Sequence, residues 1–210
     1  MFEVAPFPRA IGADVVRATA RDRAELASLL VRAFAVDPLV RWVFADDDAR
    51  ELYFRTNLEL GLPHGAVFTV DSRAGCAIWS PPGCWRVGLW TQLLLLPKIA
   101  RMLGASRFTR GMMVFDRLQK EHPEGPHYYL GVLGVDPSRQ GNGVGSTLVR
   151  AGIELADRDG LGAYLETSNP QNLPLYERHG FEVTRSFDFA SGAPRCWLMW
   201  RPPGRGAPIF

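Results

Sequence analysis

Apolar and polar positions in the first third of the chain follow the periods of helices and short strands. Apolar residues at 26, 29, 30, 33 and 34 repeat with the period of an amphipathic helix over 21–35, which Asp37-Pro38 is expected to end. Three consecutive aspartates at 46–48 offer caps for a second helix that runs to about Leu60. Strands are expected at 14–19, 67–70 and 75–79, with a hairpin-like connection at 71–73.

The second half of the chain alternates more regularly between strand and helix patterns. The expected elements are a strand at 128–135, a helix at 144–158, a strand at 163–167, a helix at 172–179, and strands at 181–189 and 195–200. Strands that alternate with helices and end in a hairpin predict an α/β domain with a mixed sheet. We expect one domain over 14–203, with a variable helical segment at 83–126 and loose termini at 1–13 and 204–210.

Composition and charge narrow the classes of protein to which this chain can belong. Its 210 residues, 47% hydrophobic and 22% charged, are ordinary for a globular domain. A formal net charge of +2 without a lysine or arginine cluster argues against a nucleic-acid partner. The most apolar stretch, 87–99, contains Pro97 and is too short to span a bilayer, so no membrane partner is expected.

Cysteine and histidine usage favours a cytoplasmic protein without a metal site. The three cysteines, Cys76, Cys84 and Cys196, are odd in number and lack C-x-x-C spacing, as in reducing compartments. The four histidines are scattered, and none has metal-ligand spacing to another histidine or cysteine. The N-terminus lacks the basic and apolar regions of a signal peptide.

The most informative pattern lies between the predicted strand at 128–135 and the helix that follows it. Glycines at 141, 143 and 145 occupy this turn, as in sites where the backbone N–H groups of a helix start bind a pyrophosphate. The spacing fits neither G-x-G-x-x-G nor the P-loop, which needs a lysine. It reads Q-x-x-G-x-G from Gln140. Such a turn also serves simply to pack a helix closely on a sheet.

A second pattern, N-x-x-x-Y-E-R-x-G-F, spans residues 172–181. Asn172 can cap a short helix, Pro174 is tolerated in its first turn, and Gly180 suits the left-handed position at its end. The two patterns together resemble the acetyl-CoA signatures of the GCN5-related N-acetyltransferase (GNAT) superfamily. The resemblance covers 127–203 strongly and 14–82 more weakly, and is greatest to puromycin N-acetyltransferase-like actinobacterial members.

This resemblance implies a GNAT fold, in which a mixed central β-sheet with splayed central strands is flanked by helices, and acetyl-CoA (coenzyme A) as the acyl donor. The splayed strand, Leu133-Gly134-Val135, is expected to offer free N–H groups to pantetheine and to the developing oxyanion. Asn172 either binds pantetheine or only caps its helix. The residues expected at the pyrophosphate are Arg139, Gln140, Gly141, Asn142, Gly143, Val144, Gly145 and Ser146.

The resemblance also suggests catalytic residues. It places the Tyr176 hydroxyl near the cofactor sulfur, where a neutral phenol can protonate the leaving thiolate; the alternative is a tyrosine that only packs its helix. The general base is open between Glu166, whose pKa burial could raise, and His127, whose imidazole suits the task. A water chain without a single base is the third possibility.

The expected activity is direct transfer of an acetyl group to a small-molecule amine, such as an antibiotic or a metabolite. Large apolar residues in 83–126 could wall a pocket for that amine, pack on the domain, or form a homodimer surface. Two alternatives stay open at this stage. One is acetylation of a protein lysine or N-terminus, and the other is a non-catalytic acyl-CoA sensor.

Overall fold

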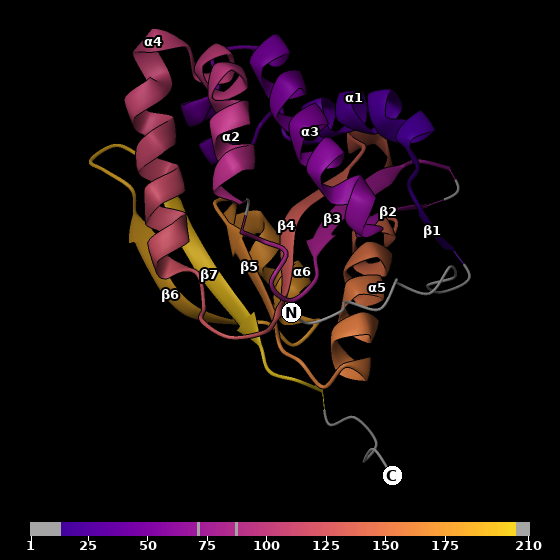
Figure 1. The fold of residues 1–210 in the computed structure, drawn as a ribbon. Helices are drawn as coiled ribbons and strands as arrows, with labels where there is room; N and C mark the ends of the chain where they lie inside the picture. Colours follow the sequence, from indigo (N-terminus) through magenta and orange to yellow (C-terminus); the bar gives the residue numbers. More distant parts are fainter. Residues whose placement is uncertain (1–13, 71, 87, 205–210) are drawn as a thin grey trace.

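A seven-stranded sheet with helices on both faces organises the chain in a computed structural model that describes residues 14–70, 72–86 and 88–204 (Figure 1). The strands run in the order β1-β2-β3-β4-β5-β7-β6. Only β4 and β5 pair in parallel, which confirms the predicted mixed sheet. The strands are β1 (Val15–Arg17), β2 (Val67–Val70), β3 (Gly75–Ser80), β4 (Tyr128–Val135), β5 (Ala163–Thr167), β6 (Glu182–Asp188) and β7 (Arg195–Arg201).

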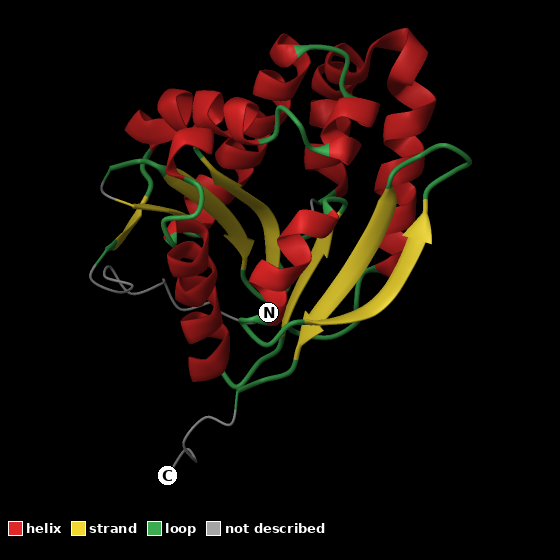
Figure 2. Cartoon of the chain, turned by 180° about the vertical axis from the view of Figure 1, so that it is seen from behind, coloured by secondary structure: helices red, strands yellow, loops and turns green. Residues whose placement is uncertain are grey.

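The helices divide between the two faces of the sheet (Figures 1 and 2). They are α1 (Arg23–Ala33), α2 (Pro38–Val43), α3 (Asp47–Gly61), α4 (Leu89–Glu121), α5 (Val144–Arg158) and α6 (Leu173–Glu177). The described residues also form four 3₁₀ turns, namely η1 (Ala20–Asp22), η2 (Leu62–His64), η3 (Pro137–Arg139) and η4 (Pro170–Asn172). Loose termini were expected at 1–13 and 204–210, and all of these residues except Gly204 lie outside the described residues, as does residue 71 of the hairpin connection.

Alternate residues of β3 point into two separate cores. Ala77 and Trp79 pack with the apolar side of α5, whereas Cys76 and Ile78 pack with α1 and α3. Because both faces are covered, every residue of β2 is buried, as in the interior strands of α/β proteins. The parallel pairing of β4 and β5 needs a crossover connection, which α5 supplies.

The helix and strand patterns predicted most of these elements to within two residues, but they did not predict α2. Asp37-Pro38, expected only to end a helix, also begins α2, because the Asp37 side chain accepts a hydrogen bond from Val40 N (2.9 Å). The helix expected at 172–179 is α6, and the 3₁₀ turn η4 directly precedes it. Asn169 caps that turn, whereas the Asn172 side chain makes no capping hydrogen bond, which corrects the capping role expected of it.

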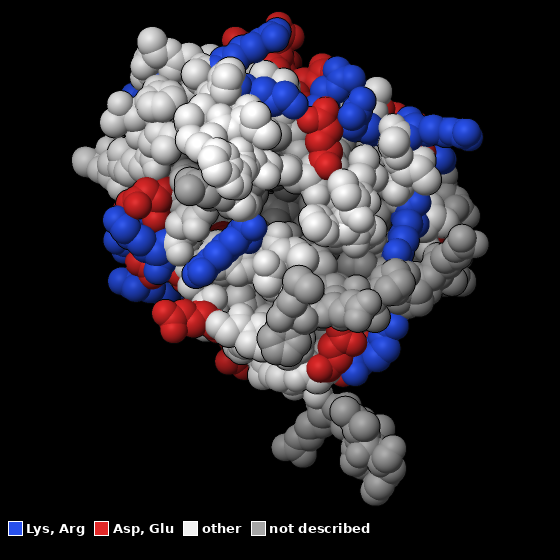
Figure 3. Space-filling model, in the orientation of Figure 1, with Lys and Arg blue, Asp and Glu red and all other residues white. Residues whose placement is uncertain are grey.

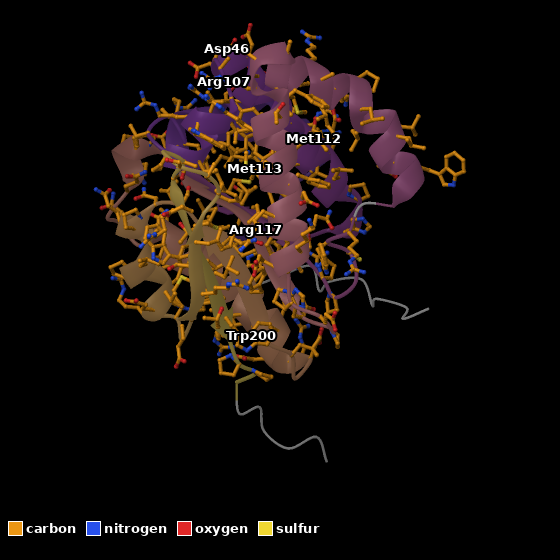
Figure 4. The ribbon with its side chains drawn as sticks, turned by 90° about the vertical axis from the view of Figure 1, so that its left-hand side faces the viewer. Asp46, Arg107, Met112, Met113, Arg117 and Trp200 are labelled. Carbon is orange, nitrogen blue, oxygen red and sulfur yellow. The ribbon has the colours of Figure 1, made fainter. Side chains whose placement is uncertain are left out.

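Within the segment 83–126, the helix α4 bends at Gly104, whose φ of 60° lies in the left-handed region. The second half of α4 starts beside α2. There, Arg107 donates to the carbonyl oxygens of Arg41 (2.9 Å) and Phe44 (2.7 Å) (Figure 4). Met102 and Leu103 pack there in a core shared with α2 and α3. Several apolar side chains of α4 are exposed, namely Trp90, Leu93, Leu94, Leu96, Phe108 and Phe115.

The two edges of the sheet are unlike its interior. β1 has only three residues. β6, at the other edge, exposes six of its seven residues and carries charged side chains at Glu182, Arg185 and Asp188. Asp188 pairs with Arg195 of β7 (3.0 Å).

Gly152 of α5 is expected to be essential for the packing of Trp79. A Cβ at position 152 would stand 2.0 Å from the Trp79 ring, which is fully buried. We expect Gly152→Ala to destabilise the protein by about 1–3 kcal/mol through overpacking, lowering the melting temperature by several degrees. Gly88→Ala is the matched control, because nothing lies within 4 Å of its added Cβ. Equal urea midpoints for the two variants would contradict this account of the α5–β3 contact.

Candidate active site

The glycine turn between β4 and α5 is held open to solvent by its own backbone. Gly141 and Gly143 have φ of +80° and +82°, which side chains rarely adopt, and no atom lies within 4 Å of a Cβ built on either. Arg139, Gln140 and Asn142 of the same turn are exposed. The turn therefore leaves room for a ligand to approach its backbone.

The start of α5 supplies hydrogen-bond donors at this turn. Thr147 N donates to the Gly143 carbonyl oxygen (3.0 Å) as the first bond of the helix. The N–H groups of Val144, Gly145 and Ser146 precede it and have no partner within the helix. The first turn contains no acidic residue, so the positive end of the helix dipole is not neutralised. Such a helix start binds phosphate groups.

Three side chains hold the turn in place. Asp136 accepts from Ser138 N (3.0 Å) and pairs with Arg32 of α1 (2.9 Å). The hydrogen bond from the Ser138 hydroxyl, followed by those from Arg32, lowers the pKa of Asp136 to about 2. Gln140 Nε2 donates to the Val135 carbonyl oxygen (3.2 Å), so this side chain supports the turn from within. Ser146 shares a short hydrogen bond with His179, which directs its hydroxyl toward the end of α6.

β4 and β5 part soon after they pair. Their parallel ladder joins Tyr128–Leu130 to Ala163–Leu165 only, although β4 continues along β3 to Val135. β5 likewise continues along β7 as far as Thr167. The two central strands therefore diverge with each held by its other neighbour, which is the splay expected from the sequence.

A bulge sets which N–H groups face the splay. Gly131 is an extra residue between the pairs that Leu130 and Val132 form with β3. Asp136 N donates to the Ala74 carbonyl oxygen (2.9 Å), on the β3 side. Because N–H groups alternate along a strand, those of Leu133 and Val135 are directed to the opposite edge, where β5 has departed.

Gly134 has a different task from the one expected of it. Its N–H lies on the β3 side by the same alternation. A Cβ at this position would stand 2.6 Å from Leu30 and 3.1 Å from Ala33 of α1. The close backbone approach expected at Gly134 is therefore that of α1.

Tyr176 lies inside the domain rather than on its surface. It is 5% exposed and packs edge-on to Phe181. Burial, and then the charge of Asp37, raises the pKa of its hydroxyl, so Tyr176 keeps its proton at neutral pH. Asp37 is half-buried at the start of α2 and accepts from the Ser168 hydroxyl (3.2 Å) just after β5. These residues bring α2, α6 and the end of β5 together.

Glu166 lies on β5 beyond the last residue paired with β4, among aromatic side chains. Its side chain is 9% exposed, and Oε1 is buried without a hydrogen-bond partner among the described residues. Burial, and then the Glu166 charge, raises the pKa of Tyr53 to about 12 and raises that of Tyr129 well above its usual value. The Tyr164 hydroxyl is also buried without a hydrogen-bond partner among these residues. The Glu166 carboxylate nevertheless interacts with Tyr129 and Tyr164, so it lies enclosed by aromatic side chains.

His127 does not stand alone at the start of β4. Its Nδ1 lies 3.0 Å from the Gly125 carbonyl oxygen, and its Nε2 lies 2.9 Å from Nε2 of His122. Burial lowers the pKa of His127, which favours the neutral ring. Because both ring nitrogens are engaged, His127 has no free nitrogen to offer a substrate amine.

Sequence reasoning missed His122, Asp37 and Tyr53. His122 lies 3.7 Å from Glu166 through Nδ1 and stacks on Trp85, with ring centroids 3.5 Å apart. The five-residue spacing from His122 to His127 fits neither a helix nor a strand, so no periodicity marked this pair. Among the described residues, no group of three or more His, Cys, Asp and Glu is placed to hold a metal ion.

The chain is similar to known proteins in both sequence and fold. The model of the Acetyltransferase (GNAT) family matches residues 76–181, from β3 through α6. The chain belongs to this family. It is therefore an N-acetyltransferase by class, and GNAT-fold enzymes use acetyl-CoA. In the part of the chain that is described, no helix combines the length and the apolar character needed to cross a membrane.

Relatives are similar over most of the chain. An uncharacterised N-acetyltransferase of Schizosaccharomyces pombe is 27% identical over 184 residues, which cover 81% of this chain and 74% of that protein. A Corynebacterium glutamicum protein described as histone acetyltransferase HPA2 and related acetyltransferase is 28% identical, with a TM-score of 0.67 over 94% of this chain and 98% of that one. Arylalkylamine N-acetyltransferase 2 of Aedes aegypti shares the fold at 14% identity, with a TM-score of 0.67 over 90% and 98% of the two chains.

The open turn can be tested by comparing two glycines of like conformation at opposite ends of α5. Gly143→Ala and Gly160→Ala both place a side chain at positive φ (+82° and +65°) with nothing within 4 Å. Both should lose about 1–2 kcal/mol of stability. Only Gly143→Ala should also weaken coenzyme A binding, by about tenfold or more, because it disturbs the N–H groups at the helix start. Equal dissociation constants in calorimetry would exclude the turn as the pyrophosphate site.

Proposed function

We propose that this protein transfers an acetyl group from acetyl-CoA directly to the amine of a small molecule. The observation that carries the proposal is the continuous run from the parted edge of β4 to the start of α5. Along this run, the N–H groups of Leu133 and Val135 are available to pantetheine and the thioester carbonyl. The N–H groups after Gly143 are available to the pyrophosphate. The first set of donors suits the pantetheine arm and thioester of acetyl-CoA, and the second set suits its pyrophosphate.

Acetyl-CoA, when bound, supplies a thioester that an amine can attack. The N–H groups of Leu133 and Val135 would stabilise negative charge on the carbonyl oxygen. Tyr176 would give its proton to the departing sulfur, a role supported by its buried position and by a hydroxyl that stays protonated at neutral pH. The binding role expected of Asn172 stays a proposal. Its side chain is free of the capping bond and is half-buried.

Glu166 is the proposed base, in preference to His127. Its Oε1 has no hydrogen-bond partner among the described residues, whereas both nitrogens of His127 are engaged. A carboxylate can accept a proton from an ammonium group that hydrogen-bonds to it. Asp37, on the α6 side of the splay, would add a second negative charge for a cationic acceptor when it is ionised, and burial raises the pKa of this carboxyl.

The surroundings of Glu166 favour a small acceptor over a protein. Tyr53, Tyr129 and Tyr164 come from three elements and interact with this carboxylate, which leaves its side chain only 9% exposed. Such an enclosure leaves little room for bulk around the acceptor nitrogen, and aromatic faces also attract cations. Figure 3 shows a recess near the middle of the viewed face, bordered mainly by uncharged residues.

The acceptor can be sought by measuring the release of coenzyme A thiol from acetyl-CoA. The amines to compare are puromycin, an arylalkylamine, a polyamine and a lysine-containing peptide. We expect release above the hydrolysis background with one or more of the small amines and none with the peptide. Release with the peptide alone would replace this proposal by protein acetylation. Tight coenzyme A binding without release in any reaction would favour an acyl-CoA sensor.

Removal of the Tyr176 hydroxyl separates catalysis from binding. We expect Tyr176→Phe to lower kcat by about 100-fold, as for loss of a general acid, while the dissociation constant of coenzyme A stays within about twofold. Tyr128→Phe is the control, because that tyrosine is equally buried and donates its hydroxyl to Asp159 (2.6 Å), at the far end of α5. Similar kcat values for both variants would leave Tyr176 with a packing role only.

A further inference from the structure

We propose that Glu166 and His122 share one proton. His127 orients the His122 ring, and the pair takes up the proton that the acceptor ammonium must lose. The proposal rests on the proposed acetyl transfer. Glu166 is then the group that meets the amine. His122 and His127 are positioning residues that act through it.

The argument starts from the tautomer of His127. A carbonyl oxygen can only accept, so the 3.0 Å contact with Gly125 places a proton on His127 Nδ1. The ring is buried, with 1% exposure, and burial favours its neutral form. A neutral ring with a proton on Nδ1 has a bare Nε2. His127 Nε2 is therefore an acceptor.

The orientation of His122 follows from that acceptor. His122 Nε2 lies 2.9 Å from His127 Nε2 and must be the donor, so it carries a proton. A neutral His122 then has its lone pair on Nδ1. This nitrogen faces Glu166 Oε1 at 3.7 Å, and the carboxylate oxygen has no hydrogen-bond partner among the described residues. At 3.7 Å the two atoms are farther apart than in a hydrogen bond, so the two side chains would have to move slightly closer to hold one proton between these lone pairs.

Aromatic rings fix this arrangement. Trp85 stacks on the His122 ring at 3.5 Å, and the faces of aromatic rings stabilise a positive charge. Tyr129 and Tyr164 pack edge-on to the same ring, each with a centroid distance of 4.9 Å. The other titratable or charged groups of the surrounding elements are Tyr53 of α3, Arg117 and Glu121 at the end of α4, and Arg86 beyond Trp85.

The pair completes the proton balance of the transfer. A proton leaves the acceptor ammonium for the site between Glu166 Oε1 and His122 Nδ1, and the neutral amine forms the new C–N bond. The C–S bond breaks, and the sulfur takes the Tyr176 proton. The second proton lost by the amine nitrogen restores Tyr176 through water. The pair then releases its proton to solvent, so each turnover yields amide, thiol and one free proton.

The shared proton can be observed without turnover by NMR of protein labelled with ¹⁵N in its four histidines. We expect His127 to carry its proton on Nδ1 throughout a titration from about pH 5.5 to 8.5. His122 should carry protons on both nitrogens to a higher pH in the wild type than in Glu166→Gln, with midpoints at least about one unit apart. Equal midpoints, or a proton on His127 Nε2, would overturn the shared-proton site.

The catalytic role of the pair is tested by the pH profile of kcat/KM for an amine found in the thiol-release assay. The rising limb reports the base of the free enzyme, and its midpoint should match the NMR midpoint of His122. His122→Gln should lower kcat/KM by about 10- to 100-fold at neutral pH and move the limb to lower pH. The control is His64→Gln, an exposed histidine of η2, which should leave rate and profile unchanged.

The NMR titration and the pH profile together distinguish failure of the shared-proton pair from failure of the proposed function. If the enzyme is active and the pH profile of kcat/KM for His122→Gln superimposes on that of the wild type, only the catalytic role of the Glu166–His122 pair is overturned. The absence of turnover with every amine overturns the proposed function, and the role of the pair in transfer falls with it. In that case the NMR titration still decides whether the proton is shared. If the variants fail to fold, the wild-type tautomer of His127 remains a decisive measurement.

Discussion

Backbone N–H groups inside a sheet are normally satisfied by the carbonyl groups of a neighbouring strand, and β4 departs from this rule after Leu130. A buried N–H without a partner costs about 1–3 kcal/mol, so the groups of Leu133 and Val135 need water or a ligand. The parting persists because β3 and β7 hold the two central strands on their outer sides. In the proposed function, donor binding, oxyanion stabilisation and entry of the amine would all depend on this gap.

The site is tied together by contacts between segments far apart in the chain. Arg32 of α1 holds Asp136 at the glycine turn, and Asp37 accepts from Ser168 after β5. The first contact fixes the turn on which a pyrophosphate would lie, and the second fixes the approach to the splay. α1 and the α1–α2 connection thus position both halves of the proposed site. The helices nearest the N-terminus contribute as much to its shape as the signatures in the second half.

Local patterns predicted the parts of this molecule in which chemistry and geometry agree over consecutive residues. The turn with Gly141 and Gly143 is an example, because positive φ selects glycine at fixed positions. The regular strands and α5 were predicted because their apolar residues repeat with the period of a strand or a helix. α2 was missed because Asp37-Pro38 both ends one helix and starts the next. An aspartate followed by proline is compatible with either.

Contacts across the fold could not be read from the sequence. His122 and His127 meet because the chain turns through Gly125, and Glu166 reaches His122 from a strand formed 44 residues later. Glu166 was proposed from its strand, but nothing local shows which partners surround a side chain. The same holds for Gly134, whose small size accommodates α1 rather than a ligand. Segment 83–126 is likewise divided, since it packs on α2 and α3 while exposing other apolar residues.

The outer strands have a consequence for the behaviour of the protein in a crowded cell. An open strand edge is a template on which another chain can add a strand, the first step toward β-aggregation. β1 offers an edge of three residues only, and β6 carries Glu182, Arg185 and Asp188 on its exposed surface. A chain adding to β6 would have to accommodate charges of both signs. This sheet can therefore keep an unsatisfied strand at its centre for chemistry while its rims discourage self-assembly.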